Sequence, residues 1–393
     1  MAPALMSNYG RYGVTFERGE GAYLYTTDNA QYLDFGTGIA VVSLGHCHPH
    51  LVSELQAQVG RLWHTSNLYN TRIGERMAQR LVDATFADRV LFCNSGAEAV
   101  ECGLKMIRKY MNDIGQPNRY RVITCAGSFH GRTMGTIAAG GQDKVKDGFA
   151  PIVPDFDHVP YGNLNEVRAA IGPQTAGILV EPILGEGGLR QADPEYLRGL
   201  REVADEFSLL LMFDEVQTGV GRTGKFLACE WAGVEPDIVA LAKGLGGGFP
   251  IGACLAKQHA ADALSPGTHG TTFGGNFLAM AAGNAVLDIV LADGFLDEVS
   301  GVADSLWRQL LDLQKRYPMV IEEVRGAGLM IGLKCVVPNT DLVNNLLKRR
   351  MLVVPAADNV ARLLPPLNIN EIHIEQALNH LEAACEELGN AGT

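Results

Sequence analysis

The sequence predicts an α/β fold, with a large domain built on a mostly parallel sheet and a smaller α+β domain. The chain has 393 residues, which is more than one hydrophobic core usually holds. From about Leu51 to Leu291, short apolar runs alternate with helix-like segments, as is typical of βα units. After Gly294 the pattern changes to a long amphipathic helix followed by short strands. This change predicts that the second domain begins near residue 292.

Composition and charge exclude several classes of protein. Hydrophobic residues make up 47% and charged residues 19% of the chain, and the net charge of −12 is spread without acidic or basic blocks. We therefore expect no nucleic-acid-binding face and no basic membrane-binding patch, and we expect a small ligand. The eight scattered cysteines form no CxxC pair, which predicts reduced thiols and a cytoplasmic protein.

No segment is expected to act as a signal peptide or to cross a membrane. The first 20 residues lack the basic start and apolar run of a signal peptide. The longest apolar stretch, residues 277–296, is interrupted by Asn284, Asp288 and Asp293. A buried helix is therefore expected there.

The elements of the large domain are expected over residues 51–291. Before it, residues 1–50 are assigned to the smaller domain, and residues 14–42 alternate β-rich runs with turn residues, which predicts an antiparallel meander. The predicted strands of the large domain are 89–96, 121–127, 176–183, 209–216, 237–243 and 252–257, with helices such as 97–110 and 194–207 between them. Helices are expected on both faces of such a sheet.

The C-terminal part of the smaller domain is expected over residues 292–393. A helix is predicted at 296–317, where apolar residues recur with helical spacing. Short strands are predicted at 320–328, 329–335, 352–356 and 360–367, and the chain is expected to end in a helix.

Charged residues end three of the apolar runs of the large domain. Asp214 ends the run LLLMF, Glu181 ends AGILV, and Lys243 ends DIVALA. Ligands of open α/β sheets collect at the carboxyl ends of the strands. Lys243 follows Asp214 by 29 positions, about one βαβ unit, so both side chains are expected in one crevice. Each residue alone also has a structural explanation: Lys243 as a lysine exposed to water at the end of a strand, and Asp214 as a carboxylate in a structural ion pair.

An amine and a carboxylate on two sides of one ligand suit pyridoxal 5'-phosphate. The amine forms a Schiff base with the aldehyde, and the carboxylate keeps the ring nitrogen protonated so that the ring withdraws electrons. The turn Ser95-Gly96-Ala97, between a strand and a helix, offers an anion site for the phosphate, although an ordinary N-cap explains it equally well. Residues 128–132 (SFHGR) add an aromatic face and a cation after another strand.

Two other motifs indicate different ligands. Residues 219–224 (GVGRTG) match GxGxxG, and with Lys225 they approach a Walker-type loop, so a nucleotide-binding protein is the alternative from another class. Phe226 stands where that loop needs Ser or Thr, and DEVQT separates the glycines from the strand, so we expect a flexible loop at the site. Residues 45–49 (GHCHP) lack a partner cluster for a metal, and a turn before a helix is expected.

Seven segments together resemble the class III ω-aminotransferases, which are pyridoxal-phosphate enzymes of aspartate-aminotransferase fold (fold type I), and within that class the acetylornithine subgroup. The segments follow the family order along nearly the whole chain: LDFGTGIAVVSLGHCHP, NSGAEAVE, SFHGRT, EPILGEGG, FDEVQTGVGRTGKF, LAKGLGGGFPIGA and THGTTFGGN. The resemblance implies transfer of the terminal amine of N2-acetyl-L-ornithine to 2-oxoglutarate in arginine biosynthesis, by a homodimer.

The resemblance also implies roles for individual residues, with Lys243 as the Schiff-base lysine and Asp214 as the partner of the pyridine nitrogen. The implied cofactor-binding residues are Ser95, Gly96, Ala97, Phe129, Asp214, Glu215, Val216, Gln217, Lys243 and Thr272. Phe129 is expected to stack on the ring, and Thr272 to reach the phosphate in the neighbouring subunit. The implied substrate-binding residues are Arg132, Glu186, Thr271 and Arg362. Arg362 is expected to take the carboxylate of 2-oxoglutarate and to pair with Glu186 otherwise, and no metal is expected.

Some positions depart from the family pattern. Val100 precedes Glu101 where Asn is common, Leu184 replaces a Gln, and Thr271 is often Ser, but none of these changes removes a catalytic group. Ile39 stands where ornithine aminotransferases carry a Tyr for a free α-amino acid, which argues against unmodified ornithine. The acyl group stays open, because succinylornithine, N-succinyl-diaminopimelate and 4-aminobutyrate also present a terminal amine.

Overall fold

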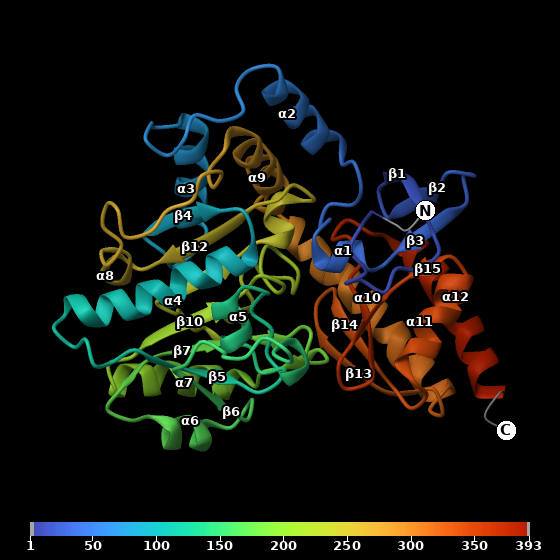
Figure 1. Cartoon of the computed structure of the whole chain (residues 1–393). Helices are drawn as coiled ribbons and strands as arrows, with labels where there is room; N and C mark the ends of the chain where they lie inside the picture. Colours follow the sequence, from blue (N-terminus) through green and yellow to red (C-terminus); the bar gives the residue numbers. More distant parts are fainter. Residues whose placement is uncertain (1–3, 391–393) are drawn as a thin grey trace.

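A seven-stranded sheet forms the centre of the larger part of the computed structural model, which describes residues 4–390 (Figure 1). In sheet order the strands are β4 (Arg89–Cys93), β12 (Gly252–Ala256), β11 (Ile238–Leu241), β10 (Leu210–Asp214), β7 (Thr175–Val180), β5 (Arg121–Cys125) and β6 (Phe156–Val159). All run parallel except β12, which is antiparallel to both neighbours. Residues 242–251 alone join β11 to β12, which is shorter than a parallel crossover usually needs. The predicted mostly parallel sheet is confirmed.

Helices cover both faces of this sheet, because successive residues of a strand point to opposite sides. Met212 of β10 lies in the apolar cluster of α4 (Gly96–Asp113), whereas the adjacent Phe213 lies in the cluster of α7 (Pro194–Glu206) and α9 (Phe277–Val290). The other helices of this part are α2 (Pro49–Val59), α3 (Arg72–Asp83), α5 (Met134–Ala139), α6 (Leu164–Ala170) and α8 (Gln258–Ala261). Its two-stranded sheet consists of β8 (Ile183–Leu184) and β9 (Arg190–Gln191).

A second hydrophobic core joins the N-terminal strands to the C-terminal quarter of the chain. It contains Leu33 and Phe35 together with Leu306, Ile331 and Leu381, and in Figure 1 the blue N-terminal strands lie beside the red C-terminal helix. One sheet has the order β1 (Phe16–Glu20), β2 (Tyr23–Thr26), β3 (Gln31–Asp34), β15 (Met351–Leu352), and the other β13 (Ile321–Ala327), β14 (Met330–Cys335), β17 (Val360–Leu363), β16 (Val354–Ala356). The helices are α1 (Thr37–Ala40), α10 (Phe295–Arg316), α11 (Asn339–Lys348) and α12 (Glu371–Asn390).

The smaller domain has the expected character. Strands β1 to β3 form the predicted antiparallel meander, and β15 adds a parallel edge to it. The predicted helix 296–317 corresponds to α10, and the predicted strands 320–328 and 329–335 correspond to β13 and β14. The domain boundaries at residues 50/51 and 291/292 stay a prediction.

The apolar stretch 277–296 forms α9, which is buried along most of its length, and the beginning of α10. In residues 4–390 no single helix is long and apolar enough to cross a membrane, and α9 and α10 satisfy that test only as a pair bent by 71°.

Residues 45–49 form the expected turn before α2. His46 Nε2 lies 2.8 Å from Asp34 Oδ2, and Pro49 begins the helix. Over the described part of the chain, no group of three or more His, Cys, Asp or Glu side chains is arranged to hold a metal ion. All eight cysteines are free thiols, and Cys47 is the exposed one.

Candidate active site

A cavity of about 340 Å³ lies where the central parallel strands end. Eight of the predicted cofactor-binding residues line it: Ser95, Gly96, Ala97, Phe129, Asp214, Val216, Gln217 and Lys243. Val41, Asn94, His130, Gly131, Glu181, Ala242 and residues 248–251 complete the wall. Parallel strands therefore bring side chains from distant segments to one edge of the sheet, as the strand-end argument predicts.

Lys243 follows β11 and lines the cavity as a mostly buried side chain. Its backbone has a φ of 45°, a left-handed conformation that is uncommon for a residue other than glycine. Burial and, to a smaller extent, the positive charge of Arg362 together lower the pKa of Lys243 to about 8. The carboxylates of Glu186, Asp214 and Glu181 oppose this change in pKa. A substantial share of Lys243 is therefore neutral near pH 7.5, which is the form that attacks an aldehyde.

Asp214, at the end of β10, is held in one orientation by two contacts. Its Oδ2 lies 2.8 Å from His130 Nδ1, and its Oδ1 accepts a hydrogen bond from Val216 N at 3.0 Å. The His130 side chain is fully buried. The sequence pattern assigns no role to His130, and the signal that it does offer is the position of His130 directly after Phe129 in a loop that follows a strand.

Glu181, at the end of β7, connects the cavity to the neighbouring loop. Its carboxylate accepts hydrogen bonds from Phe129 N at 2.8 Å and from Gly185 N at 3.1 Å. Burial, opposed by His130 and aided by the charge of Asp214, raises the pKa of Glu181 to about 7. Glu181 therefore fixes the backbone of the aromatic residue in the cavity and of the loop that carries Glu186.

The N-terminus of α4 reaches the cavity. Ser95 is the N-cap, and its hydroxyl accepts a hydrogen bond from Glu98 N at 3.3 Å. The first N–H groups of a helix have no acceptor within the helix, so they favour an anion. A Cβ at Gly96 would lie 2.7 Å from Val216 Cγ1, so the close approach of these two segments requires glycine. The N-cap interpretation is thus correct for Ser95, and it is compatible with an anion site.

Arg362 and Glu186 form an ion pair beside the cavity. Arg362 Nη2 lies 2.8 Å from Glu186 Oε1, and Arg362 Nη1 donates to Gln217 Oε1 at 3.1 Å. The Arg362 side chain is 1% exposed and the Glu186 side chain 26%. A buried guanidinium is suited to bidentate binding of a carboxylate, and the more exposed Glu186 is the partner that is free to move away.

Three further predicted residues lie outside the cavity wall. Arg132 is exposed, and its guanidinium carbon lies 5.4 Å from the centre of the Phe129 ring. The hydroxyl of Thr271 accepts a hydrogen bond at 3.1 Å from Nδ2 of Asn94, a residue that lines the cavity. Thr272 is exposed to solvent. The roles implied for these three residues stay predictions.

Glu215 and the glycine-rich segment 219–226 are built into the core. The Glu215 carboxylate accepts hydrogen bonds from Ala228 N and Cys229 N, each at 2.8 Å, so its side chain is turned away from the cavity. In the segment, Arg222 is buried and donates to backbone carbonyls of the smaller domain. The expectation of a flexible loop at the site is wrong, because these long-range bonds fix the segment, and its geometry gives the nucleotide-binding alternative no support.

Comparison with known proteins gives the family. The profile described as "Aminotransferase class-III" matches residues 6–385, and the chain belongs to this family. The acetylornithine aminotransferase of Brucella melitensis is 56% identical over 387 residues, covering 98% of this chain and 96% of that protein. The acetylornithine aminotransferase of Agrobacterium fabrum is 54% identical over 387 residues, covering 98% of this chain and 97% of that protein.

Solved structures confirm the fold. The N-acetylornithine aminotransferase of Stenotrophomonas maltophilia matches with a TM-score of 0.86 at 34% identity, covering 98% of this chain and 99% of that one. The ornithine aminotransferase of Toxoplasma gondii matches with a TM-score of 0.94 at 31% identity, covering 99% of this chain and 94% of that one. The predicted membership of the class III aminotransferases is therefore correct.

The residues at the cavity fit pyridoxal 5'-phosphate, the cofactor of this class. A lysine with a lowered pKa suits the aldehyde, and Asp214 offers a carboxylate for the ring nitrogen. Phe129 offers a flat apolar face, and the N-terminus of α4 suits the phosphate.

Proposed function

We propose that this enzyme transfers the terminal amine of N2-acetyl-L-ornithine to 2-oxoglutarate and gives N-acetyl-L-glutamate 5-semialdehyde and L-glutamate, a step of arginine biosynthesis. The relatives at 56% and 54% identity carry the name acetylornithine aminotransferase. The structural observation that carries the proposal is the pair of Arg362 and Glu186 beside the cavity of Lys243. The buried Arg362 is suited to binding a carboxylate of 2-oxoglutarate. If Glu186 can pair with Arg362 or move aside, the same site can also accept an amine donor that has no carboxylate at that position.

Lys243 and Asp214 have different roles in the proposed reaction. Pyridoxal phosphate, when bound, carries the amino group between the two substrates and withdraws electrons from the reacting carbon. With the cofactor bound, the neutral amine of Lys243 would take a proton from the amine-bearing carbon of the substrate and deliver it to the aldehyde-derived carbon of the cofactor. Asp214, which His130 orients, would hold a proton at the ring nitrogen of the cofactor. The two half-reactions follow each other in one site, so the kinetics are expected to be ping-pong.

The Glu186–Arg362 pair gives the site two states. While the terminal amine reacts, Glu186 neutralises Arg362, and an α-carboxylate finds no free cation at that position. When 2-oxoglutarate enters, its carboxylate offers a bidentate partner and Glu186 moves aside. Removal of such a masking group is expected to relax the specificity for the donor.

A panel of amine donors tests the proposal. The holoenzyme is assayed with 2-oxoglutarate and with acetylornithine, succinylornithine, N-succinyl-diaminopimelate, 4-aminobutyrate or ornithine. Acetylornithine is expected to have the highest kcat/KM, and ornithine a low one, because Ile39 replaces the Tyr of ornithine aminotransferases. A higher kcat/KM for another donor contradicts the acetyl assignment.

We further propose a homodimer in which Thr272 contributes to the site of the partner. Residues 59–69 and 271–277 lie side by side, since Asn67 Nδ2 donates to Gly274 O at 2.9 Å and Phe277 N donates to Trp63 O at 3.1 Å. These two segments expose large apolar side chains, including Trp63, Leu68, Tyr69 and Phe273. An exposed apolar surface of this kind is typical of a protein interface.

Hybrid dimers test this assembly. A Lys243→Ala chain mixed with a Thr272→Ala chain is expected to regain activity, because one of the two sites in a hybrid is intact. Active monomers in light scattering contradict the proposal. The cytoplasmic location stays a prediction.

A further inference from the structure

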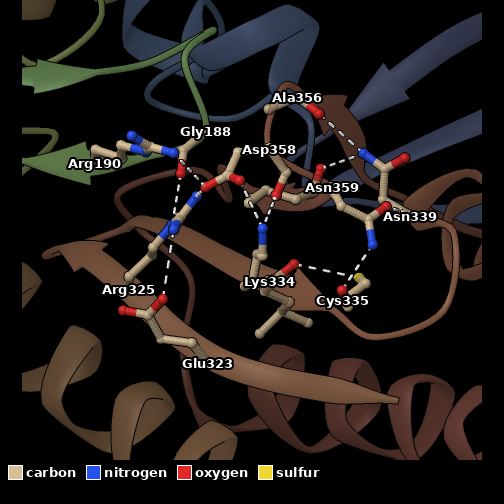
Figure 2. Close-up of polar contacts among 12 residues, drawn as sticks. Gly188, Arg190, Glu323, Arg325, Lys334, Cys335, Asn339, Ala356, Asp358 and Asn359 are labelled. Atoms are coloured by element: carbon tan, nitrogen blue, oxygen red, sulfur yellow. Dashed lines mark hydrogen bonds and ion pairs between the residues drawn. The ribbon is translucent and has the colours of Figure 1, made fainter. Parts of the chain in front are cut away.

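A cluster of charged side chains surrounds the tip of the β16–β17 hairpin, four residues before Arg362 (Figure 2). Asp358 at the tip pairs through Oδ2 with Arg325 Nη2 at 2.6 Å and with Arg190 Nη2 at 3.0 Å, and through Oδ1 with Lys334 Nζ at 2.6 Å. Partial burial opposes ionisation, but the hydrogen bonds from these three cations hold the pKa of Asp358 well below its usual range. Asp358 therefore keeps its charge at the pH of catalysis.

The backbone of the tip is held by contacts other than these ion pairs. Asp358 and Asn359 have φ values of 57° and 54°, which form a tight turn. Asn359 Nδ2 donates to Cys335 O at 2.7 Å and to Val337 O at 2.8 Å. Asn339 Nδ2 donates to the carbonyls on both sides of the turn, at 3.0 and 2.8 Å. Loss of the Asp358 charge is therefore expected to leave the hairpin in place.

The loop that carries Glu186 is fastened to this tip. Residues 185–189 join β8 to β9, and Ala357 N donates to Glu186 O at 3.0 Å. Arg325 Nε donates to Gly188 O at 2.7 Å. Gly188 has a φ of +99°, and a Cβ there would lie 2.8 Å from both Arg325 Nη2 and Ala357 O, so the contact requires glycine. Arg325 thus bridges the loop and Asp358, as Figure 2 shows.

Arg362 is held in place by strand pairing and by hydrogen bonds that do not involve the cluster around Asp358. Its strand β17 pairs with β14 on one side and with β16 on the other. Its side chain also donates to Gln217 Oε1 at 3.1 Å and to Pro355 O at 3.2 Å. The Glu186 loop is held at one end by Gly185 N, which donates to Glu181, and at the hairpin tip by Arg190 and Arg325, which both pair with Asp358. A weaker cluster is therefore expected to loosen Glu186 and to leave Arg362 where it is.

We propose that Asp358 is a positioning residue which, with Arg325 and Arg190, fixes the Glu186 loop against the hairpin of Arg362 and so sets how readily Glu186 releases Arg362 to a carboxylate. The proposal rests on the proposed function of the Glu186–Arg362 pair. It makes donor specificity depend on a carboxylate that is outside the cavity wall and that touches neither substrate nor cofactor.

The test compares two amine donors in single-turnover reactions of the holoenzyme. The rate of the glutamate half-reaction is divided by the rate of the acetylornithine half-reaction, each followed by the absorbance of the bound cofactor. Asp358→Asn is expected to raise this ratio by about five-fold, within the range of a typical coupling between two sites. Glu186→Ala is expected to raise it more. The double variant is expected to match Glu186→Ala alone, since both changes act on one contact.

Asp288→Asn is the matched control. Asp288 also contacts three basic side chains, His50, Arg76 and Arg80, and its side chain is 31% exposed against 24% for Asp358. This control is expected to leave the ratio unchanged. If Asp358→Asn folds poorly, Arg190→Gln is used in its place, because the Arg190 side chain is more than half exposed. Arg190→Gln is expected to raise the same rate ratio by a smaller factor.

Two results overturn the proposal: an unchanged ratio in Asp358→Asn or its replacement, or a double variant in which the two effects add. A different result tests the proposed function, namely a wild-type enzyme that does not react with acetylornithine. In that case the ratio is measured with the terminal amine that the wild type accepts, so the two failures are separate.

Discussion

The lowered pKa of Lys243 predicts how the rate of cofactor uptake depends on pH, and it predicts that two substitutions shift this pH dependence in opposite directions. At pH 7.5 a lysine with a pKa of about 8 is neutral in roughly one molecule in four, whereas at its ordinary value of 10.5 it is neutral in roughly one in a thousand. The site therefore gains roughly 200-fold in reactive amine. Because the neutral form attacks, the rate at which the apoenzyme takes up pyridoxal phosphate is expected to rise with pH and to level off above about pH 8.

Two substitutions are expected to move that midpoint in opposite directions. Arg362 lowers the pKa of Lys243, so Arg362→Gln is expected to raise the midpoint. Glu186 raises the pKa, so Glu186→Gln is expected to lower it. The assay follows the cofactor absorbance after mixing from pH 6 to about 10, and only differences between proteins are interpreted, since the titration of the cofactor itself is common to all. Midpoints that move in the same direction, or do not move, refute the reasoning.

The other predictions concern single groups of the site. Lys243→Ala is expected to abolish transamination with an unchanged circular dichroism spectrum, and near-normal turnover rules the assignment out. Asp214→Ala is expected to lose most activity, since an unprotonated ring is a poor electron sink; retained kcat means that another group protonates the ring. His130→Phe removes the bond to Asp214 and is expected to lower kcat by roughly ten- to a hundred-fold, because a bond to a charged group contributes about 1.5–3 kcal/mol. Gly96→Ala, whose Cβ meets Val216, is expected to lose cofactor faster in dialysis than Gly60→Ala, which meets nothing within 4 Å; equal retention contradicts the close fit.

The central part of the site was predictable because its residues lie at the ends of apolar runs. The topology of parallel strands then places Asp214 and Lys243 together, since β10 and β11 are neighbours. The neighbour of Asp214 shows where this argument fails. Consecutive residues point to opposite sides, so Glu215 faces the backbone of residues 228–229 while Asp214 faces the cavity.

Contacts between distant segments were not predictable from local pattern. Glu186 and Arg362 are 176 positions apart, and the family resemblance supplied their expected pairing. Arg222 is buried because its acceptors are carbonyls 107 and 143 positions away, so its glycine-rich surroundings gave the wrong expectation of a flexible loop. The position of His130 after a strand points to the site but not to its partner, and its contact with Asp214 becomes visible in three dimensions. The antiparallel direction of β12 follows from a short connection, which strand propensity does not report.

Measurement of the two half-reactions separately tests the account of one site with two states most directly. In Arg362→Ala the reaction of 2-oxoglutarate with the aminated enzyme is expected to be lost far more than the reaction with acetylornithine. In Glu186→Ala, glutamate is expected to gain relative to acetylornithine, because Arg362 is no longer masked. Equal losses in both half-reactions of Arg362→Ala, with an unchanged donor preference in Glu186→Ala, contradict the account.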